Sequence, residues 1–181
     1  AAFGALWMRR GEVGVYSDMC GHATMGVAVT AVEMGMVEMK EPVTEVVMDT
    51  PAGLISAKVN VENGRVKNVS LRNVPSFHYQ TSKIEVPGLG DVRVEIAFGG
   101  NTIAIVEAND IGIRTSFSEI MRSLDRISSV IDSINEQVEI YDPVKGQIKM
   151  NATAIMISDE PTNPSADVKY IAVTKDLFID R

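Results

Sequence analysis

Short runs rich in β-branched residues, separated by turn residues, dominate the middle of the chain and predict strands. A two-residue hairpin is predicted at Asn63-Gly64, because both turn positions need a positive φ that these residues tolerate. Pro51-Ala52-Gly53 predicts another reversal. The first group of predicted strands lies at 44–49, 53–61 and 65–71, and an apolar, strand-like run at 2–8 precedes it, followed by a polar turn at 9–12 and a short strand at 13–16.

A second group of strands follows Pro75 and the polar stretch His78–Ser82, which we interpret as a crossing between two domains. Gly99-Gly100-Asn101 interrupts this group. Such a glycine pair marks either a close approach to the backbone or a plain turn, and the residues leave both open. The predicted strands of this half lie at 83–86, 91–98 and 102–107, with a turn at 87–90, and then at 147–158, 168–173 and 177–180.

Two helices are predicted from apolar residues at helical spacing. The first runs from His22 to Glu33, is closed by Gly35, and turns Met25, Val29 and Val32 toward a core. The second begins at the capping box Ser116-Phe117-Ser118-Glu119 and reaches about Ile140, before Tyr141-Asp142-Pro143. We interpret its apolar stripe as core packing against the second domain's sheet: Ile120, Leu124, Ile127, Ile131, Ile134 and Val138.

Composition narrows the class of protein. With 181 residues and 45% hydrophobic content, the chain can bury a core and form one or two small domains. A net charge of −7 without a basic cluster argues against nucleic acid and anionic membranes as partners. A single cysteine excludes an internal disulfide and fits a reducing compartment. No apolar run reaches the roughly 18 residues of a membrane helix, so the cytoplasm is the expected location.

The candidate chemistry is concentrated in Ser17–Val27, which holds Cys20 and one of the two histidines, His22. Cys20 lies where a strand is predicted to turn into the first helix, and free N–H groups at a helix start favour an anion. A thiolate, or a ligand carboxylate beside the sulfur, would be stabilised there. We therefore expect an accessible, reactive thiol. Taken alone, this stretch also fits an inert cysteine buried among apolar neighbours.

Met19-Cys20-Gly21-His22-Ala23-Thr24-Met25-Gly26 resembles the first signature of the proline racemase family. Ile179-Asp180-Arg181 resembles the lead-in to the family's second signature, in which Asp-Arg-Ser-Pro precedes a second catalytic cysteine. The five motifs follow one another in register across nearly the whole chain. The three that lie between the two signatures are Asp49-Thr50-Pro51-Ala52-Gly53-Leu54, Asn73-Val74-Pro75-Ser76-Phe77 and Ala97-Phe98-Gly99-Gly100-Asn101.

The resemblance implies an α/β fold of the diaminopimelate-epimerase-like type. Two similar domains would each form a curled, mostly antiparallel sheet around a central helix, with the active site in the cleft between them. Residues 1–75 would supply most of the first domain and residues 76–181 the front part of the second. The implied activity is that of a cofactor-independent racemase or epimerase, which inverts Cα of proline or hydroxyproline by a two-cysteine acid/base mechanism.

The resemblance also implies roles for individual residues. Cys20 would be one catalytic acid/base, Gly21 would offer its N–H to the substrate carboxylate, and His22 and Asp180 would contact the substrate, with its ring nitrogen as the expected point of contact. From sequence alone, His22 fits equally a supporting residue or a helix cap. No cofactor is expected, since the chain lacks a dinucleotide fingerprint and a P-loop, and no metal, since its histidines and cysteine are scattered. The expected partner is a small substrate, proline or hydroxyproline; a homodimer is left open.

The chain departs from the family pattern at its ends. It stops at Arg181, before the second cysteine, and starts at Ala1 within a strand-like run. We interpret it as a fragment that is inactive alone. Two alternatives stay open: a trans-3-hydroxyproline dehydratase of the same family, and a non-catalytic half-enzyme. Thr102-Ile103 stands where relatives often carry aromatic residues, so the substrate is not specified.

Overall fold

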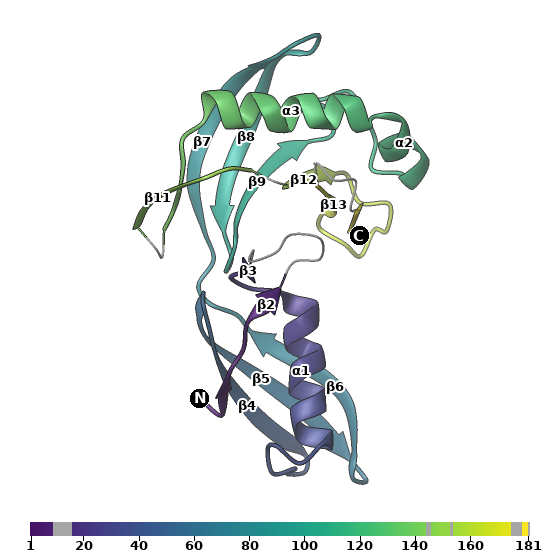
Figure 1. Ribbon diagram of the computed structural model, residues 1–181. Coiled ribbons are helices and arrows are strands. Elements are labelled where there is room, and N and C mark those ends of the chain that lie inside the picture. The colour runs from purple at the N-terminus through teal and green to yellow at the C-terminus, as the bar shows by residue number, and fades with distance from the viewer. Residues whose placement is uncertain (9–15, 144–145, 153, 175–178, 181) are drawn as a thin grey trace. The chain divides into compact units, whose positions relative to one another are not determined.

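The computed structural model describes residues 1–8, 16–143, 146–152, 154–174 and 179–180, whose course Figure 1 shows. The chain divides into two compact units. The first comprises Ala1–Ser76 with Gly99–Asn101, and the second comprises Phe77–Phe98 with Thr102–Arg181. The segment Gly99–Asn101 therefore belongs to the first unit, although the strands on both sides of it belong to the second.

The first unit pairs a sheet with one helix, α1 (Gly21–Glu33), which packs on the sheet (Figure 1). The three long strands each pair antiparallel with their neighbour, while the short first strand runs parallel to its neighbour. In spatial order the strands are β1 (Phe3–Gly4), β4 (Val43–Thr50), β5 (Gly53–Glu62) and β6 (Arg65–Arg72). A separate antiparallel ladder joins β2 (Trp7–Met8) to β3 (Tyr16–Ser17).

Local residue chemistry accounts for the turns of this sheet. Asn63 and Gly64 have φ of 54° and 68° and join β5 to β6, which confirms the predicted hairpin. Pro51 and Ala52 join β4 to β5, and the hydroxyl of Thr50 donates to the carbonyl of Gly53 (2.7 Å). The three strands predicted at 44–49, 53–61 and 65–71 are confirmed.

The core-facing side of α1 differs from the prediction. The buried positions are Thr24, Ala28, Ala31 and Val32, and only Val32 belongs to the predicted stripe. Small side chains on this face let the helix lie close to the sheet, where it meets a core that includes Val46, Met48, Ala57, Val59 and Val61. Apolar residues surround most of α1, so hydrophobic spacing alone could not select the face.

The second unit is built on a six-stranded sheet. Adjacent strands in this sheet are antiparallel, except for β12 and β9, which are parallel. In spatial order the strands are β14 (Ile179–Asp180), β13 (Lys169–Thr174), β12 (Ala154–Asp159), β9 (Thr102–Glu107), β8 (Gly90–Phe98) and β7 (Phe77–Val86). A two-stranded hairpin of β10 (Ile140–Asp142) and β11 (Gly146–Met150) completes the described strands of this unit.

Helix α3 (Leu124–Gln137) supplies the main apolar face on this sheet (Figure 1). Ile127, Ile131 and Ile134 are fully buried in the core, which confirms the predicted packing of the stripe. The predicted single helix from Ser116 to about Ile140 is wrong, however. It breaks at Ser123 into α2 (Phe117–Arg122) and α3.

The break has a local cause. Ser123 leaves the helical conformation (φ −108°, ψ 13°), and its N–H donates to Ile120 three residues back, which tightens and ends the turn. Serine competes with helical backbone bonding and so tolerates this geometry. The capping prediction at Ser116 is confirmed, because its hydroxyl accepts from the N–H of Glu119 (3.3 Å). The helix also ends earlier than predicted, at Gln137, because Ile140–Asp142 forms β10.

Three further strand predictions need correction. The single strand predicted at 147–158 is two strands, β11 and β12, which belong to different sheets. The stretch His78–Ser82 is not a crossing but the first half of β7; its polar side chains suit a half-exposed edge strand. The run at 2–8 forms two short strands, β1 and β2. The predictions at 9–12 and 13–15, residues 177 and 178 of the last predicted strand, and Arg181 of the last motif lie outside the described residues.

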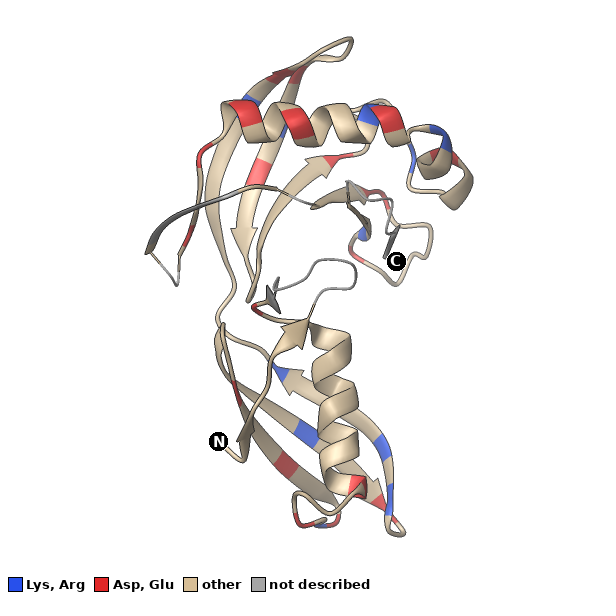
Figure 2. Cartoon of the chain, in the orientation of Figure 1, with Lys and Arg blue, Asp and Glu red and all other residues tan. Residues whose placement is uncertain are grey.

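Acidic and basic residues are interspersed along the strands of the first unit, and acidic residues recur along α3 (Figure 2). Within the described ranges, none of the helices has the length and apolar character needed to cross a bilayer.

Candidate active site

Cys20 is the N-cap residue of α1. Its backbone is extended (φ −141°, ψ 110°) and the helix begins at Gly21, one residue earlier than predicted. The thiol is half-buried, and it makes no capping hydrogen bond to the helix among the described residues. Thr24 is the first residue whose N–H has an intrahelical acceptor, the carbonyl of Cys20 (2.9 Å). The N–H groups of residues 21–23 are thus available at the helix end where the thiol lies.

Thr24 fixes the backbone on the C-terminal side of Cys20. Besides the N–H bond, its hydroxyl donates to the Cys20 carbonyl at 2.7 Å. Thr24 is completely buried, so its side of this double contact is shielded from water. The peptide plane that follows the Cα atom of Cys20 is therefore held in one orientation.

Asn101 fixes the backbone on the other side, although it lies 82 residues away from Met19. Its amide nitrogen donates to the carbonyl of Met19, and its amide oxygen accepts from the Met19 N–H at 3.3 Å. The hydroxyl of Ser17 lies within hydrogen-bond distance of the same two oxygen atoms, 2.9 Å from the Met19 carbonyl and 3.1 Å from Asn101 Oδ1. All three residues belong to the first unit.

A glycine makes this approach feasible. Gly100 has φ +98°, and a Cβ atom built there would lie 2.7 Å and 2.9 Å from the side chain of Met19. Any larger residue would collide with the residue preceding Cys20. The glycine pair thus marks a close approach of the Met19 side chain to the backbone at Gly100, one of the two interpretations that the sequence left open.

Residues from four of the five motifs meet around this point in the first unit. The side-chain amide of Asn73 donates to the carbonyl of Gly99 (2.8 Å), and its oxygen accepts from the N–H of Val74 (2.9 Å). Val74 in turn is the nearest neighbour, at 3.3 Å, of a Cβ built on Gly53. Motifs that are far apart in sequence therefore form one support for the Met19–Cys20 peptide.

The other predicted site residues have different positions. Gly21 is half-buried and His22 is exposed, both in the first turn of α1 beside Cys20. Asp180 lies in β14, the outer strand of the sheet in the second unit. In the described part of the chain, no group of three or more His, Cys, Asp or Glu side chains is placed to hold a metal ion.

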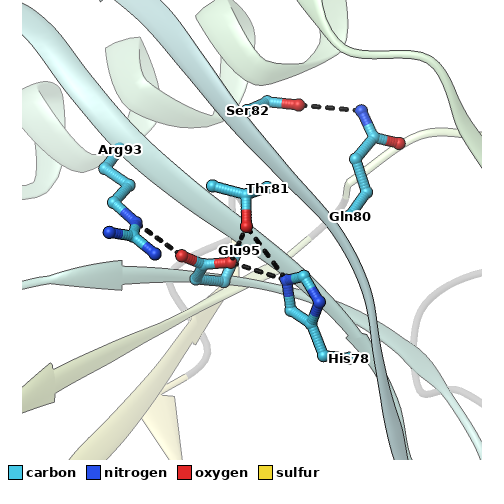
Figure 3. Close-up of polar contacts among 6 residues, drawn as sticks. All are labelled: His78, Gln80, Thr81, Ser82, Arg93 and Glu95. Atoms are coloured by element: carbon cyan, nitrogen blue, oxygen red, sulfur yellow. Dashed lines mark hydrogen bonds and ion pairs between the residues drawn. The ribbon is translucent and has the colours of Figure 1, made fainter.

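A second polar cluster lies on β7 and β8 of the second unit (Figure 3). One carboxylate oxygen of Glu95 accepts from the Thr81 hydroxyl (2.6 Å) and meets His78 Nε2 (2.7 Å), while its other oxygen accepts from Arg93 Nε (2.6 Å). The Thr81 bond above all, then Arg93 and His78, lowers the pKa of Glu95 from 4.5 to about 2 against an opposing effect of partial burial.

This cluster is not a hydrolytic triad. A triad uses both imidazole nitrogens, one toward the hydroxyl and one toward the carboxylate. Here Thr81 and Glu95 both lie at the same nitrogen, Nε2 of His78. The arrangement thus joins two strands and does not activate the Thr81 hydroxyl, so it assigns His78 a structural role.

Sequence reasoning did not assign a supporting role to Ser17, Thr24 or Asn101. Two of them stand in or beside the motif around Cys20, and Asn101 follows the glycine pair. Thr24 is the one polar residue among the buried positions of α1, but which face is buried depends on the sheet that the helix meets, so the sequence did not mark it. The pairing of Asn101 with Met19 had no local signal, because it depends on how β8 and β9 return the chain.

A comparison with protein-family models decides the family: the model described as "Proline racemase" matches residues 1–181. The chain belongs to the proline racemase family. It is 43% identical over 185 residues to a proline racemase from Acetoanaerobium sticklandii, covering 100% of this chain and 53% of that protein. This family member therefore spans about half the length of the curated relatives it matches.

Relatives with other activities are also similar to this proline racemase family member. A 4-hydroxyproline 2-epimerase from Streptosporangium roseum is 41% identical, over 82% of this chain and 44% of that protein. A trans-3-hydroxy-L-proline dehydratase from Colwellia psychrerythraea is 34% identical, over 99% and 50%. A crystal structure of a probable proline racemase from Agrobacterium radiobacter K84 matches with a TM-score of 0.82 at 24% identity, covering 97% of this chain and 54% of that one. That likeness shows a shared fold.

Proposed function

We propose that this chain carries one half of the catalytic machinery of a cofactor-independent racemase or epimerase that inverts Cα of proline or hydroxyproline. The observation that supports the proposal most strongly is the position of Cys20, half-buried at the N-cap of α1 with available backbone N–H groups beside it. Relatives named as a proline racemase and a 4-hydroxyproline 2-epimerase, each above 40% identity, point to the substrate class.

The chemistry follows from what inversion requires. One group must remove the proton from one face of Cα, and a second must deliver a proton to the opposite face. In this proposal the thiolate of Cys20 takes the proton and becomes a thiol, while the electron pair left on Cα spreads into the substrate carboxylate. A second thiol then protonates the other face. The chain contains one cysteine, so the second thiol belongs to residues outside these 181.

The helix start suits the substrate carboxylate. The N–H of Gly21 is one of the available donors, and the partial positive charge of the helix end favours the carboxylate, most strongly when the delocalised charge develops. We assign His22, exposed in the first turn, and Asp180, in β14, to the ring nitrogen of the substrate. An exposed imidazole and a carboxylate are suitable acceptors for an ammonium group.

We further propose that the chain holds two similar domains of the diaminopimelate-epimerase-like type, 1–75 and 76–181. The two compact units match this division except at Ser76 and Gly99–Asn101, which belong to the first unit. Each unit holds a mostly antiparallel sheet that packs against one long helix.

A dehydratase is the second candidate, favoured by the similarity to a trans-3-hydroxy-L-proline dehydratase. In a dehydratase, loss of hydroxide from Cβ replaces the second protonation, so the residue opposite Cys20 need not be a thiol. A half-enzyme that binds without turnover is the third.

The deciding experiment incubates the native gene product that contains this sequence with L-proline, trans-4-hydroxy-L-proline and trans-3-hydroxy-L-proline, and separates the products by chiral chromatography. We expect the Cα epimer of one of the first two. A cyclic imino acid, formed by loss of water from the 3-hydroxy substrate alone, would support the dehydratase instead. The 181-residue chain assayed alone is expected to give no turnover, because it supplies a thiol for one face only.

A further inference from the structure

The side chain of Asn101 makes an unusual contact for a loop residue. Its amide pairs with both polar backbone groups of Met19, accepting from the N–H and donating to the carbonyl. These are the two hydrogen bonds that a neighbouring strand would make to Met19 in a sheet. Met19, however, lies between β3 and α1 and belongs to no strand. Met19 is itself buried, so water does not compete freely for these groups.

The contact has its effect at Cys20. The Met19 carbonyl belongs to the peptide plane that immediately precedes the Cα atom of Cys20, and Asn101 holds that plane. Thr24 holds the plane that follows it, through two bonds to the Cys20 carbonyl. With both planes fixed, the Cα–Cβ bond of Cys20 has one direction, and the sulfur can move only by rotation about that bond.

We propose that Asn101 is a positioning residue for Cys20, which keeps the thiol at the N-terminus of α1 by pairing with the backbone of Met19. Gly100 is part of the same device, because its φ of +98° and missing side chain let Asn101 reach Met19. The positioning of the thiol stands on the geometry alone. Its consequence for turnover rests on the proposed function.

The same amide-to-backbone pairing occurs in the second unit and offers a matched control. Asn135 donates to the Ala152 carbonyl (3.0 Å) and accepts from its N–H (2.7 Å). Removing it deletes an equivalent pair of hydrogen bonds but leaves the unit that contains Cys20 untouched.

The first test uses the single cysteine of the chain and two alkylating agents, anionic iodoacetate and neutral iodoacetamide. Their rate ratio at one pH is independent of how much of the thiol is ionised, and it reports whether the positive helix end lies beside the sulfur. We expect Asn101→Ala to lower the iodoacetate-to-iodoacetamide ratio about two- to five-fold, the size of a helix-end effect on one charge. Asn135→Ala should leave the ratio unchanged. An unchanged ratio in a folded Asn101→Ala chain would overturn the proposal.

A second measurement needs no variant, so it holds even where Asn101→Ala fails to fold. Amide hydrogen exchange of the unmodified chain, followed by NMR, should show the Met19 N–H protected to a degree comparable with strand amides. Free exchange of that proton would contradict the pairing.

A third measurement separates this inference from the proposed function. In the native gene product, Asn101→Ala should lower kcat about 10- to 100-fold, the scale of a misplaced catalytic group, while KM changes little. If the alkylation ratio falls but the unmodified protein shows no turnover, the positioning holds and the proposed function fails. If turnover is present and kcat is unaffected by Asn101→Ala, the positioning role of Asn101 is wrong and the proposed function still holds.

Discussion

Gly100 offers the sharpest test of the support around Cys20, and Gly100→Ala is the perturbation. Two separable costs are expected. An L-residue at φ +98° is strained by about 1–2 kcal/mol. In addition, the new methyl group would lie 2.7 Å from Met19 Cβ and 2.9 Å from Met19 Cγ. Both contacts are much closer than van der Waals distance, and such overpacking costs about 1–3 kcal/mol.

Gly64→Ala is the matched control. Gly64 also has a positive φ, +68°, but no atom lies within 4 Å of a Cβ built there. This substitution therefore carries the conformational cost alone, about 1–2 kcal/mol, whereas Gly100→Ala carries both, about 2–5 kcal/mol in sum. The difference between the two variants isolates the contact with Met19.

The assay is urea unfolding followed by tryptophan fluorescence. Trp7 is the single tryptophan of the chain, is 7% exposed and belongs to the first unit, so its signal reports the unit that holds both glycines. We expect Gly100→Ala to lose more unfolding free energy than Gly64→Ala by about 1–3 kcal/mol. Equal losses in the two variants would refute the close approach of Gly100 to Met19.

Four further substitutions test the second unit, with far-UV circular dichroism as the measurement. Ile131→Ala should lower the unfolding free energy by about 2–5 kcal/mol because Ile131 is fully buried; Leu124→Ala should cost clearly less because Leu124 is only partly buried, and equal costs would contradict the assigned helix face. Ser116→Ala should cost about 1 kcal/mol through the lost cap of α2, and no loss would contradict that cap. The lowered pKa of Glu95 means that its stabilisation is complete above pH 4.5 and is lost as the pH falls toward 2; Glu95→Gln should therefore be less stable than the unmodified chain at pH 7, on the order of 1 kcal/mol for a partly exposed cluster, and the gap should close by pH 2, whereas a gap independent of pH would contradict the assignment.

Features set by neighbouring residues could be predicted from the sequence. Asn63-Gly64 adopts the predicted turn because both residues accept positive φ, and Ser116 caps a helix because its hydroxyl reaches an N–H three residues on. Cys20 lies at the start of α1 for the same kind of reason: strand residues end before it and helix formers follow. Local chemistry decides these features, so a local pattern is sufficient to find them.

Features set by distant contacts could not be predicted in this way. The pattern around α1 is apolar on most sides, so its buried face depends on the sheet that it meets, and Ala28 replaces the expected Met25 there. The apolar residues keep their helical spacing on both sides of Ser123. Their periodicity therefore does not reveal that the helix breaks there. The pairing of Asn101 with Met19 spans 82 positions in sequence. The motifs marked these residues as belonging to one family, but only the fold shows what they hold in place.

The most direct test of the account is incorporation of solvent deuterium at Cα of proline by the native gene product in D₂O, with unmodified and Cys20→Ser proteins compared side by side. The measurement follows both enantiomers by mass spectrometry, and the unmodified protein should place one deuterium in each inverted product. Cys20→Ser should abolish inversion in both directions, because each direction uses one thiol as base and the other as acid. Inversion that persists at an undiminished rate in Cys20→Ser would contradict the assignment of Cys20 as the acid/base group.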